Sequence, residues 1–206
     1  MDKDERYLFI DFEFTMPEGR DNPKDFFPEI IEYGIVEVKG DKVVNQYNSY
    51  VKPRAFPTLT NRCKNFLSIS EDDLKTGVNF DDFLALLQKL NLPDNPTIAT
   101  WGNMDMKVLM QNCQYAGHEF PLKGKQLDLS IEYKKFFGDR NQTGLWKAIQ
   151  QYGDKGTGIW HRALDDAMMT YELFKKIERD RRYVGNYKST TIGDVVDFSQ
   201  LFNGLT

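Results

Sequence analysis

Apolar side chains follow strand spacing in three early segments of the chain. Residues 6–14 (RYLFIDFEF) are rich in aromatic and β-branched side chains, which predicts a buried strand. Residues 29–39 and 43–52 predict two more strands, and the Gly40-Asp41 dipeptide between them is typical of a hairpin turn. The pattern therefore predicts three strands in an antiparallel meander, with the first strand central in the sheet.

Helical spacing replaces strand spacing after Pro53 and Pro57. Residues 80–90 (FDDFLALLQKL) repeat their apolar side chains with the period of an amphipathic helix. The other segments with helical spacing are 61–67, 70–76, 103–115, 129–137, 144–152 and 163–182, and residues 96–101 form one more short strand. Strands followed by alternating strand and helix predict an α/β fold, a mixed sheet flanked by helices.

The length of 206 residues fits one globular domain, and an apolar content of 40% is enough to fill its core. We assign residues 1–182 to this domain and the less periodic residues 183–206 to a C-terminal appendage of unknown purpose. The two cysteines, Cys63 and Cys113, have no paired spacing, and there is no apolar run of roughly 18 residues. We therefore expect a cytoplasmic protein that does not enter a membrane.

The formal net charge of −4 lowers the expectation of a nucleic-acid partner, because proteins that bind phosphate backbones usually carry a basic excess. A site built from carboxylates is an exception. Such a site stays acidic until divalent cations fill it, and the bound cations then reverse the charge that a substrate meets.

Asp11 and Glu13 lie two residues apart in the first predicted strand, so they project from the same face. Two neighbouring carboxylates in a hydrophobic strand repel each other, and their burial is costly unless a cation compensates them. The alternative is an edge strand whose acidic side chains are solvated.

Asp105 follows the short strand 96–101 and opens a predicted helix. It shares a helical stripe with Val108, Leu109 and Asn112, which places its carboxylate toward the sheet. Capping of the helix N-terminus by Asp105 or Asn103 is the alternative interpretation.

His161 and Asp166 lie at the start of the last long helix, five residues apart, so they do not share a helix face. We expect His161 to precede the helix and Asp166 to reach inward from it, on the apolar stripe with Thr170, Leu173 and Ile177. Asp165 falls on a more solvated side of the helix, where its negative charge is stabilised by the helix dipole at the N-terminus. The other histidine, His118, is expected at the surface.

Four carboxylates, from Asp11, Glu13, Asp105 and Asp166, are therefore expected around one point. Oxygen ligands of this kind suit Mg²⁺ or Mn²⁺ better than zinc. Two such ions are the usual arrangement for in-line attack on a phosphodiester. A neutral His161 nearby has the chemistry needed to take a proton from the attacking water.

The order Asp11-x-Glu13, Asp105 and His161-x4-Asp166 resembles the three motifs of the DEDDh exonuclease superfamily, over roughly residues 5–180. The resemblance implies a ribonuclease H-like fold, with a mixed five-stranded sheet whose first three strands are antiparallel. It implies a metal-dependent 3′→5′ exonuclease that releases nucleoside 5′-monophosphates. Asp11, Glu13, Asp105 and Asp166 would ligate two Mg²⁺ or Mn²⁺ ions, and Glu13 and His161 would be catalytic, His161 as general base.

Finer features resemble the Eri-type exoribonuclease branch, and most of all its bacterial KapD-type members. They include the run Phe27-Pro-Glu-Ile-Ile-Glu32, the segment Tyr50-Val-Lys-Pro53, and Cys63. Position by position, the resemblance places Phe14 and Thr15 beside the last nucleotide, and it favours the 3′ end of single-stranded RNA as the partner.

Surface candidates for substrate contact follow from residue type. Trp101 or Phe66 would offer a stacking surface, and the basic side chains available for upstream phosphates are Arg54, Arg62, Lys64, Lys107 and Lys123.

Two other functions stay open from the sequence. KapD-type proteins are described as inhibitors of a sporulation kinase pathway, so the chain is alternatively a regulatory protein that keeps the fold and acts by binding a protein partner. A DNA-directed exonuclease would share all the catalytic residues and differ in how it treats the sugar 2′-hydroxyl. The sequence does not predict the oligomeric state.

Overall fold

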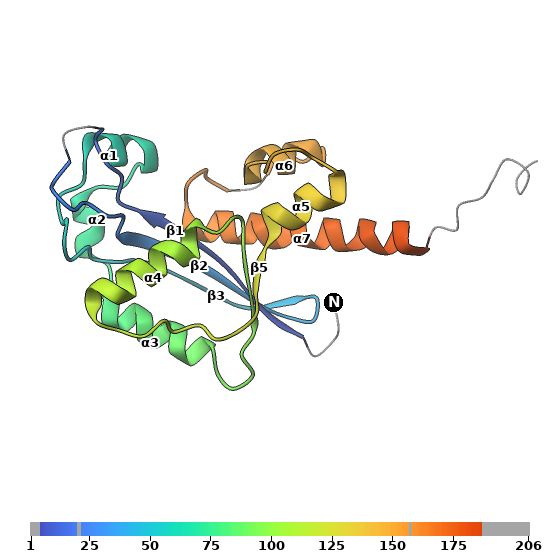
Figure 1. The fold of residues 1–206 in the computed structure, drawn as a ribbon, viewed down its shortest axis with the longest axis horizontal. Helices are drawn as coiled ribbons and strands as arrows, with labels where there is room; N and C mark the ends of the chain where they lie inside the picture. Colours follow the sequence, from blue (N-terminus) through green and yellow to red (C-terminus); the bar gives the residue numbers. More distant parts are fainter. Residues whose placement is uncertain (1–4, 20–21, 157, 187–206) are drawn as a thin grey trace, which may run out of the picture.

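The computed structural model describes residues 5–19, 22–156 and 158–186 (Figure 1). A five-stranded sheet runs through its centre, in the order β3-β2-β1-β4-β5. The strands are β1 (Arg6–Phe14), β2 (Ile30–Lys39), β3 (Lys42–Tyr50), β4 (Thr97–Thr100) and β5 (Gln126–Asp128). The first three strands pair in antiparallel fashion, while β1 pairs with β4 and β4 with β5 in parallel. The expected mixed sheet, with β1 central, is confirmed.

All seven segments with helical spacing form helices. They are α1 (Asn61–Leu67), α2 (Glu71–Lys75), α3 (Phe80–Leu90), α4 (Met104–Ala116), α5 (Leu129–Phe137), α6 (Leu145–Gln151) and α7 (Ala163–Asn186). Helix α7 continues past the expected end at residue 182. The predicted boundary between domain and appendage therefore falls inside α7, and residues 187–206 of the appendage lie outside the described residues. Within the described ranges, no helix is long and apolar enough to cross a membrane.

Alternate side chains of β1 enter two separate cores. Leu8, Ile10 and Phe12 pack with α3 and α4 on one face of the sheet. Tyr7 and Phe9 pack with α7 on the other face, as Figure 1 shows by the position of that helix. Because side chains two apart share a face, the strand spacing puts Asp11 and Glu13 on the α7 side.

Gly34 of β2 allows α7 to begin close to the sheet. It pairs with Asp11 of β1, and a Cβ added at this glycine would lie 2.1 Å from the backbone carbonyl carbon of Ala163. Any side chain at position 34 would push away the first turn of α7, which carries Asp166. The glycine therefore sets the distance between the strand that carries Asp11 and the helix that carries Asp166.

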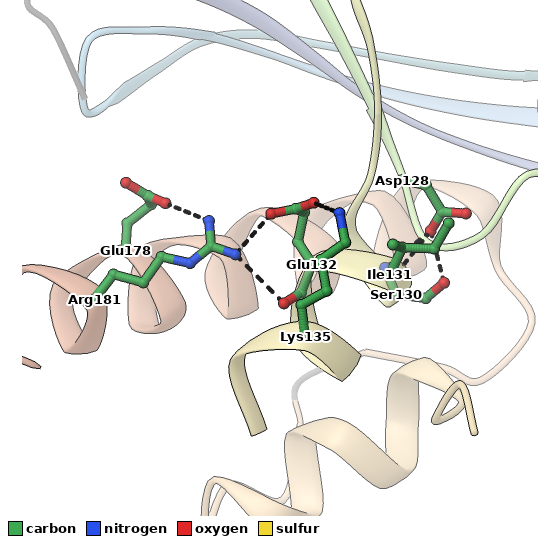
Figure 2. Close-up of polar contacts among 7 residues, drawn as sticks. All are labelled: Asp128, Ser130, Ile131, Glu132, Lys135, Glu178 and Arg181. Carbon is green, nitrogen blue, oxygen red and sulfur yellow. Dashed lines mark hydrogen bonds and ion pairs between the residues drawn. The ribbon is translucent and has the colours of Figure 1, made fainter. Parts of the chain in front are cut away.

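Helices α5 and α7 are joined by a charged contact (Figure 2). The Arg181 guanidinium donates to the Glu132 carboxylate at 2.8 Å and to the Glu178 carboxylate at 3.2 Å. At the same N-terminal end of α5, the Asp128 carboxylate accepts from the Ser130 and Ile131 backbone amides and so caps the helix where β5 ends. These contacts hold α5 between the sheet edge and α7.

Candidate metal centre and active site

The sequence-predicted acids and His161 meet at the end of β1. One ligand atom each of Glu13, His161 and Asp166 lie within 4.8 Å of one another, a spacing at which they are able to hold a metal ion together. Glu13 and Asp166 are buried, and His161 is half-buried. Asp11 and Asp105 stand beside this group, close enough for their charges to act on it.

Asp105 links α4 to strand β1. It is buried in the first turn of α4, and its Oδ1 accepts a hydrogen bond from the Phe12 backbone amide at 3.0 Å. That amide lies between Asp11 and Glu13. Asn103 is the residue at the N-cap position, and its side chain makes no cap hydrogen bond. The structure therefore favours the inward role of Asp105 over the capping interpretation.

Burial and mutual repulsion raise the pKa of each acid. Burial is the largest cause throughout, and it brings the pKa of Glu13 to about 8, that of Asp105 to about 7 and that of Asp166 to about 6. The pKa of Asp11 is raised well above its ordinary value by burial and then by the charges of Asp105, Asp166 and Glu13. These carboxylate oxygens suit divalent cations, because a bound cation offsets the energetic cost of keeping several buried carboxylates ionised.

These pKa shifts predict that the metal-free protein loses stability as the pH rises. Each raised pKa means that the folded state binds more protons than the unfolded state between the two pKa values. The free energy of unfolding should therefore fall from about pH 4 to about pH 8, the window set by Glu13, Asp105 and Asp166. Thermal unfolding in chelator at pH 5, 6.5 and 8 measures this, and saturating Mn²⁺ should flatten the trend. A midpoint that is highest at pH 8 in chelator would contradict it.

His161 lies on the segment before α7, as expected, and its backbone φ of 60° is in the left-handed region. The Phe66 ring packs against its imidazole, with ring centroids 4.1 Å apart. Burial lowers the pKa of His161 below its ordinary value. The imidazole is therefore neutral near pH 7 and free to accept a proton.

An ion pair that the sequence reasoning missed fixes the residue after His161. Arg162 donates to Oε1 of Glu32 from Nε at 3.1 Å and from Nη2 at 3.0 Å, and its guanidinium lies over the Tyr50 ring. Glu32 is almost fully buried and is the β2 partner of Glu13 in the strand register. The pair holds the backbone that carries His161 against the sheet.

Trp146 of α6 is a second residue that the sequence did not reveal. Its indole Nε1 donates a hydrogen bond to Oδ1 of Asp166 at 2.8 Å. Gly156 leaves room for this ring, since a Cβ at that position would lie 2.3 Å from the indole. The hydrogen bond fixes the orientation of one expected metal ligand.

We expect Trp146→Phe to weaken metal binding about 10- to 100-fold, because it removes the hydrogen bond to Asp166 and keeps an aromatic ring in place. Calorimetric titration with Mn²⁺ measures the affinity. Trp101→Phe is the matched control. The Trp101 indole donates to the Thr143 carbonyl at 2.9 Å and not to a carboxylate of the site. Loss of the indole N–H at position 101 should therefore leave the Mn²⁺ affinity unchanged. Equal affinities for all three proteins would contradict a positioning role for Trp146.

The three predicted substrate-binding residues have different surroundings. Phe14 is half-buried at a bulge just after Glu13 and packs against the core. Thr15 is buried, and its hydroxyl accepts from the Glu29 backbone amide at 2.9 Å. Trp101 is partly buried against two core clusters beside α5, α6 and α7. Their contact with substrate stays a prediction.

Comparison with known proteins decides the family. The exonuclease family (RNase T) matches residues 8–174, a range that includes all five site residues. The fold is similar to the solved nuclease domain of 3′hExo, a DEDDh family member, bound to rAMP, with a TM-score of 0.77 and 26% identity over 87% of this chain and 94% of that one. The chain belongs to the DEDDh 3′→5′ exonuclease family. The predicted ribonuclease H-like fold and enzyme class are thereby confirmed.

Curated relatives agree with this assignment. The chain is 54% identical to the probable 3′-5′ exonuclease KapD of Bacillus subtilis (strain 168), over 97% of each chain. It is 27% identical to ERI1 exoribonuclease 2 of Xenopus laevis, over 84% of this chain and 28% of that relative. This DEDDh chain therefore corresponds to nearly all of the Bacillus relative and to about a quarter of the frog relative. The expected resemblance to the Eri-type branch and to KapD-type proteins is confirmed.

Proposed function

We propose that this exonuclease shortens single-stranded RNA from its 3′ end and releases nucleoside 5′-monophosphates. Two Mg²⁺ or Mn²⁺ ions would be held by Asp11, Glu13, Asp105 and Asp166, with His161 as general base. The observation that carries the proposal is the meeting of Glu13, His161 and Asp166 within 4.8 Å, beside two further acids whose pKa values are raised by burial.

RNA is favoured by the names of the relatives. One is an ERI1 exoribonuclease, and one solved neighbour is bound to rAMP. A further structure, 25% identical with a TM-score of 0.75, is described as 3′-end specific recognition of histone mRNA stem-loop by 3′-exonuclease. We also propose a cytoplasmic location, which is supported by the two free, buried cysteines.

The bound ions and the side chains of the proposed site have separate roles in the reaction. Bound divalent ions supply charge neutralisation and Lewis acidity at the scissile phosphate. His161 would take a proton from the attacking water on a ring nitrogen while the water oxygen bonds to the phosphorus of the terminal nucleotide. The bond from that phosphorus to the 3′-oxygen of the preceding nucleotide would break, and a solvent proton would complete the new 3′-hydroxyl. Arg162 holds the backbone beside His161 through its ion pair with Glu32, and Phe66 packs against the His161 ring. Trp146 orients Asp166 through its hydrogen bond.

Substrate choice is tested with 5′-labelled RNA and DNA of one sequence, each with Mg²⁺ and with Mn²⁺. We expect the RNA to shorten faster, and RNA with a single 2′-deoxy residue at the 3′ end to lose much of that advantage in the first step only. DNA that shortens as fast as RNA, or faster, would show that the RNA preference is wrong while leaving the exonuclease assignment intact.

The number of ions is tested separately by calorimetry with Mn²⁺ and a nucleoside 5′-monophosphate. We expect two ions per chain in the wild-type protein and at most one in Asp105→Asn. A stoichiometry of one in the wild-type protein would contradict the two-ion proposal.

A further inference from the structure

Large apolar side chains are exposed directly before His161. Trp160 is 55% exposed and Ile159 is 66% exposed. Tryptophan usually buries most of its large surface, so an indole left in solvent beside a catalytic residue suggests a binding role. From this part of the chain, the proposed active site uses the residues that follow Trp160, namely His161 and Asp166.

One face of the Trp160 indole is already supported. It stacks on Trp146 with ring centroids 5.1 Å apart and an interplanar angle of 27°. Trp146 is in turn held by its hydrogen bond to Asp166, and the backbone before Trp160 is anchored because the Ile159 amide donates to Oδ2 of Asp165 at 2.8 Å. These contacts restrict the motion of the Trp160 side chain. A ligand that stacks on its exposed part therefore costs less side-chain conformational entropy.

The position of Trp160 fits a base near the cleaved bond. A ring nitrogen of His161 lies within 4.8 Å of ligand atoms of Glu13 and Asp166, and consecutive Cα atoms are about 3.8 Å apart. A nucleotide whose phosphate reaches the carboxylates therefore brings its own base, or that of a neighbour, within reach of the Trp160 side chain. Phe66, the other exposed ring near the site, already packs against the His161 imidazole.

We propose that Trp160 is a stacking platform for one nucleobase of a single-stranded substrate, with Trp146 as its support. This inference rests on the proposed function and names a contact of the same site. A nucleobase is favoured over an apolar protein segment because the neighbouring acids, filled with divalent cations, attract a phosphate chain, and that chain carries bases with flat π faces. Stacking on an indole also accepts any base, which suits an enzyme that removes successive nucleotides.

The test measures binding and does not depend on turnover. Fluorescence anisotropy of a 5′-labelled RNA hexamer is recorded with Ca²⁺ in place of Mg²⁺, and electrophoresis verifies that the strand stays intact. We expect Trp160→Ala to weaken binding about 5- to 150-fold and Trp160→Phe to lose less. Ile159→Ala, which removes the neighbouring exposed side chain that has no π face, is the matched control and should stay within about twofold of wild type.

An abasic scan identifies the contact. Hexamers that lack one base, at each of the last three positions in turn, are bound to the wild-type protein and to Trp160→Ala. At one of the three positions, we expect removal of the base to weaken hexamer binding by the wild-type protein. The same removal should hardly change hexamer binding by Trp160→Ala, which already lacks the stacking partner. Additive losses at every position, or wild-type affinity in Trp160→Ala, would overturn the platform. A wild-type protein that passes this scan but fails to cleave in Mg²⁺ would instead contradict the proposed function.

Discussion

Asp166→Asn should abolish phosphodiester cleavage and, in the metal-free protein, raise the thermal unfolding midpoint. Activity should fall at least about 1,000-fold, because an ion that stabilises the transition state by several kcal/mol loses a ligand. Stability should rise because the pKa of Asp166 is raised to about 6, mainly by burial, so its ionised form is costly at neutral pH. An amide removes that charge and keeps an oxygen for the Trp146 indole.

Thermal melts with and without Mn²⁺ separate the two effects of Asp166→Asn. Mn²⁺ should raise the midpoint of the wild-type protein far more than that of the variant. Asp165→Asn is the control. Asp165 neighbours Asp166 in the sequence but bonds the Ile159 amide, so this variant should keep cleavage within about tenfold of wild type. Wild-type cleavage by Asp166→Asn, or a lower midpoint in chelator, would contradict the assignment of Asp166 as a buried metal ligand.

His161→Ala should slow the maximal rate about 100- to 10,000-fold, the range expected for loss of a general base. In the wild-type protein the rate should rise with pH as the His161 imidazole loses its proton. This rise should lie below the ordinary histidine range, because burial lowers the pKa of His161. In His161→Ala that dependence should disappear.

The pH dependence is measured with saturating Mn²⁺, so that the acids hold metal at each pH. His118→Ala is the matched control, because His118 is the other histidine of the chain. It lies at the surface, as predicted, and its ring contacts Asp81. This variant should keep both the rate and its pH dependence. A His161→Ala protein that stays within tenfold of wild type and keeps the rise with pH would remove His161 from the mechanism.

Local periodicity made much of the site predictable. Alternation along a strand put Asp11 and Glu13 on one face, and helical stripes placed Asp105 and Asp166 inward, where both are buried. The five-residue spacing from His161 to Asp166 excluded a common helix face, and His161 does precede α7.

Features without a local pattern were missed. Strand β5 has three residues, too few for alternation to show. The Trp146 to Asp166 hydrogen bond and the Arg162 to Glu32 ion pair join residues 20 and 130 positions apart in the sequence, so only the folded chain brings them together. The left-handed backbone of His161 is likewise imposed by its tertiary surroundings.

The most direct test of the account is the fate of 5′-labelled single-stranded RNA incubated with the wild-type protein in Mn²⁺, in chelator, and with Asp11→Asn in Mn²⁺. We expect a ladder that shortens by single nucleotides from the 3′ end in the first reaction only, with nucleoside 5′-monophosphates as the released product. RNA that stays intact with the wild-type protein in Mn²⁺ would contradict the account. If DNA and RNA also stayed intact with Mg²⁺, regulation through a protein partner would be favoured. Equal degradation by Asp11→Asn would contradict the assigned metal centre.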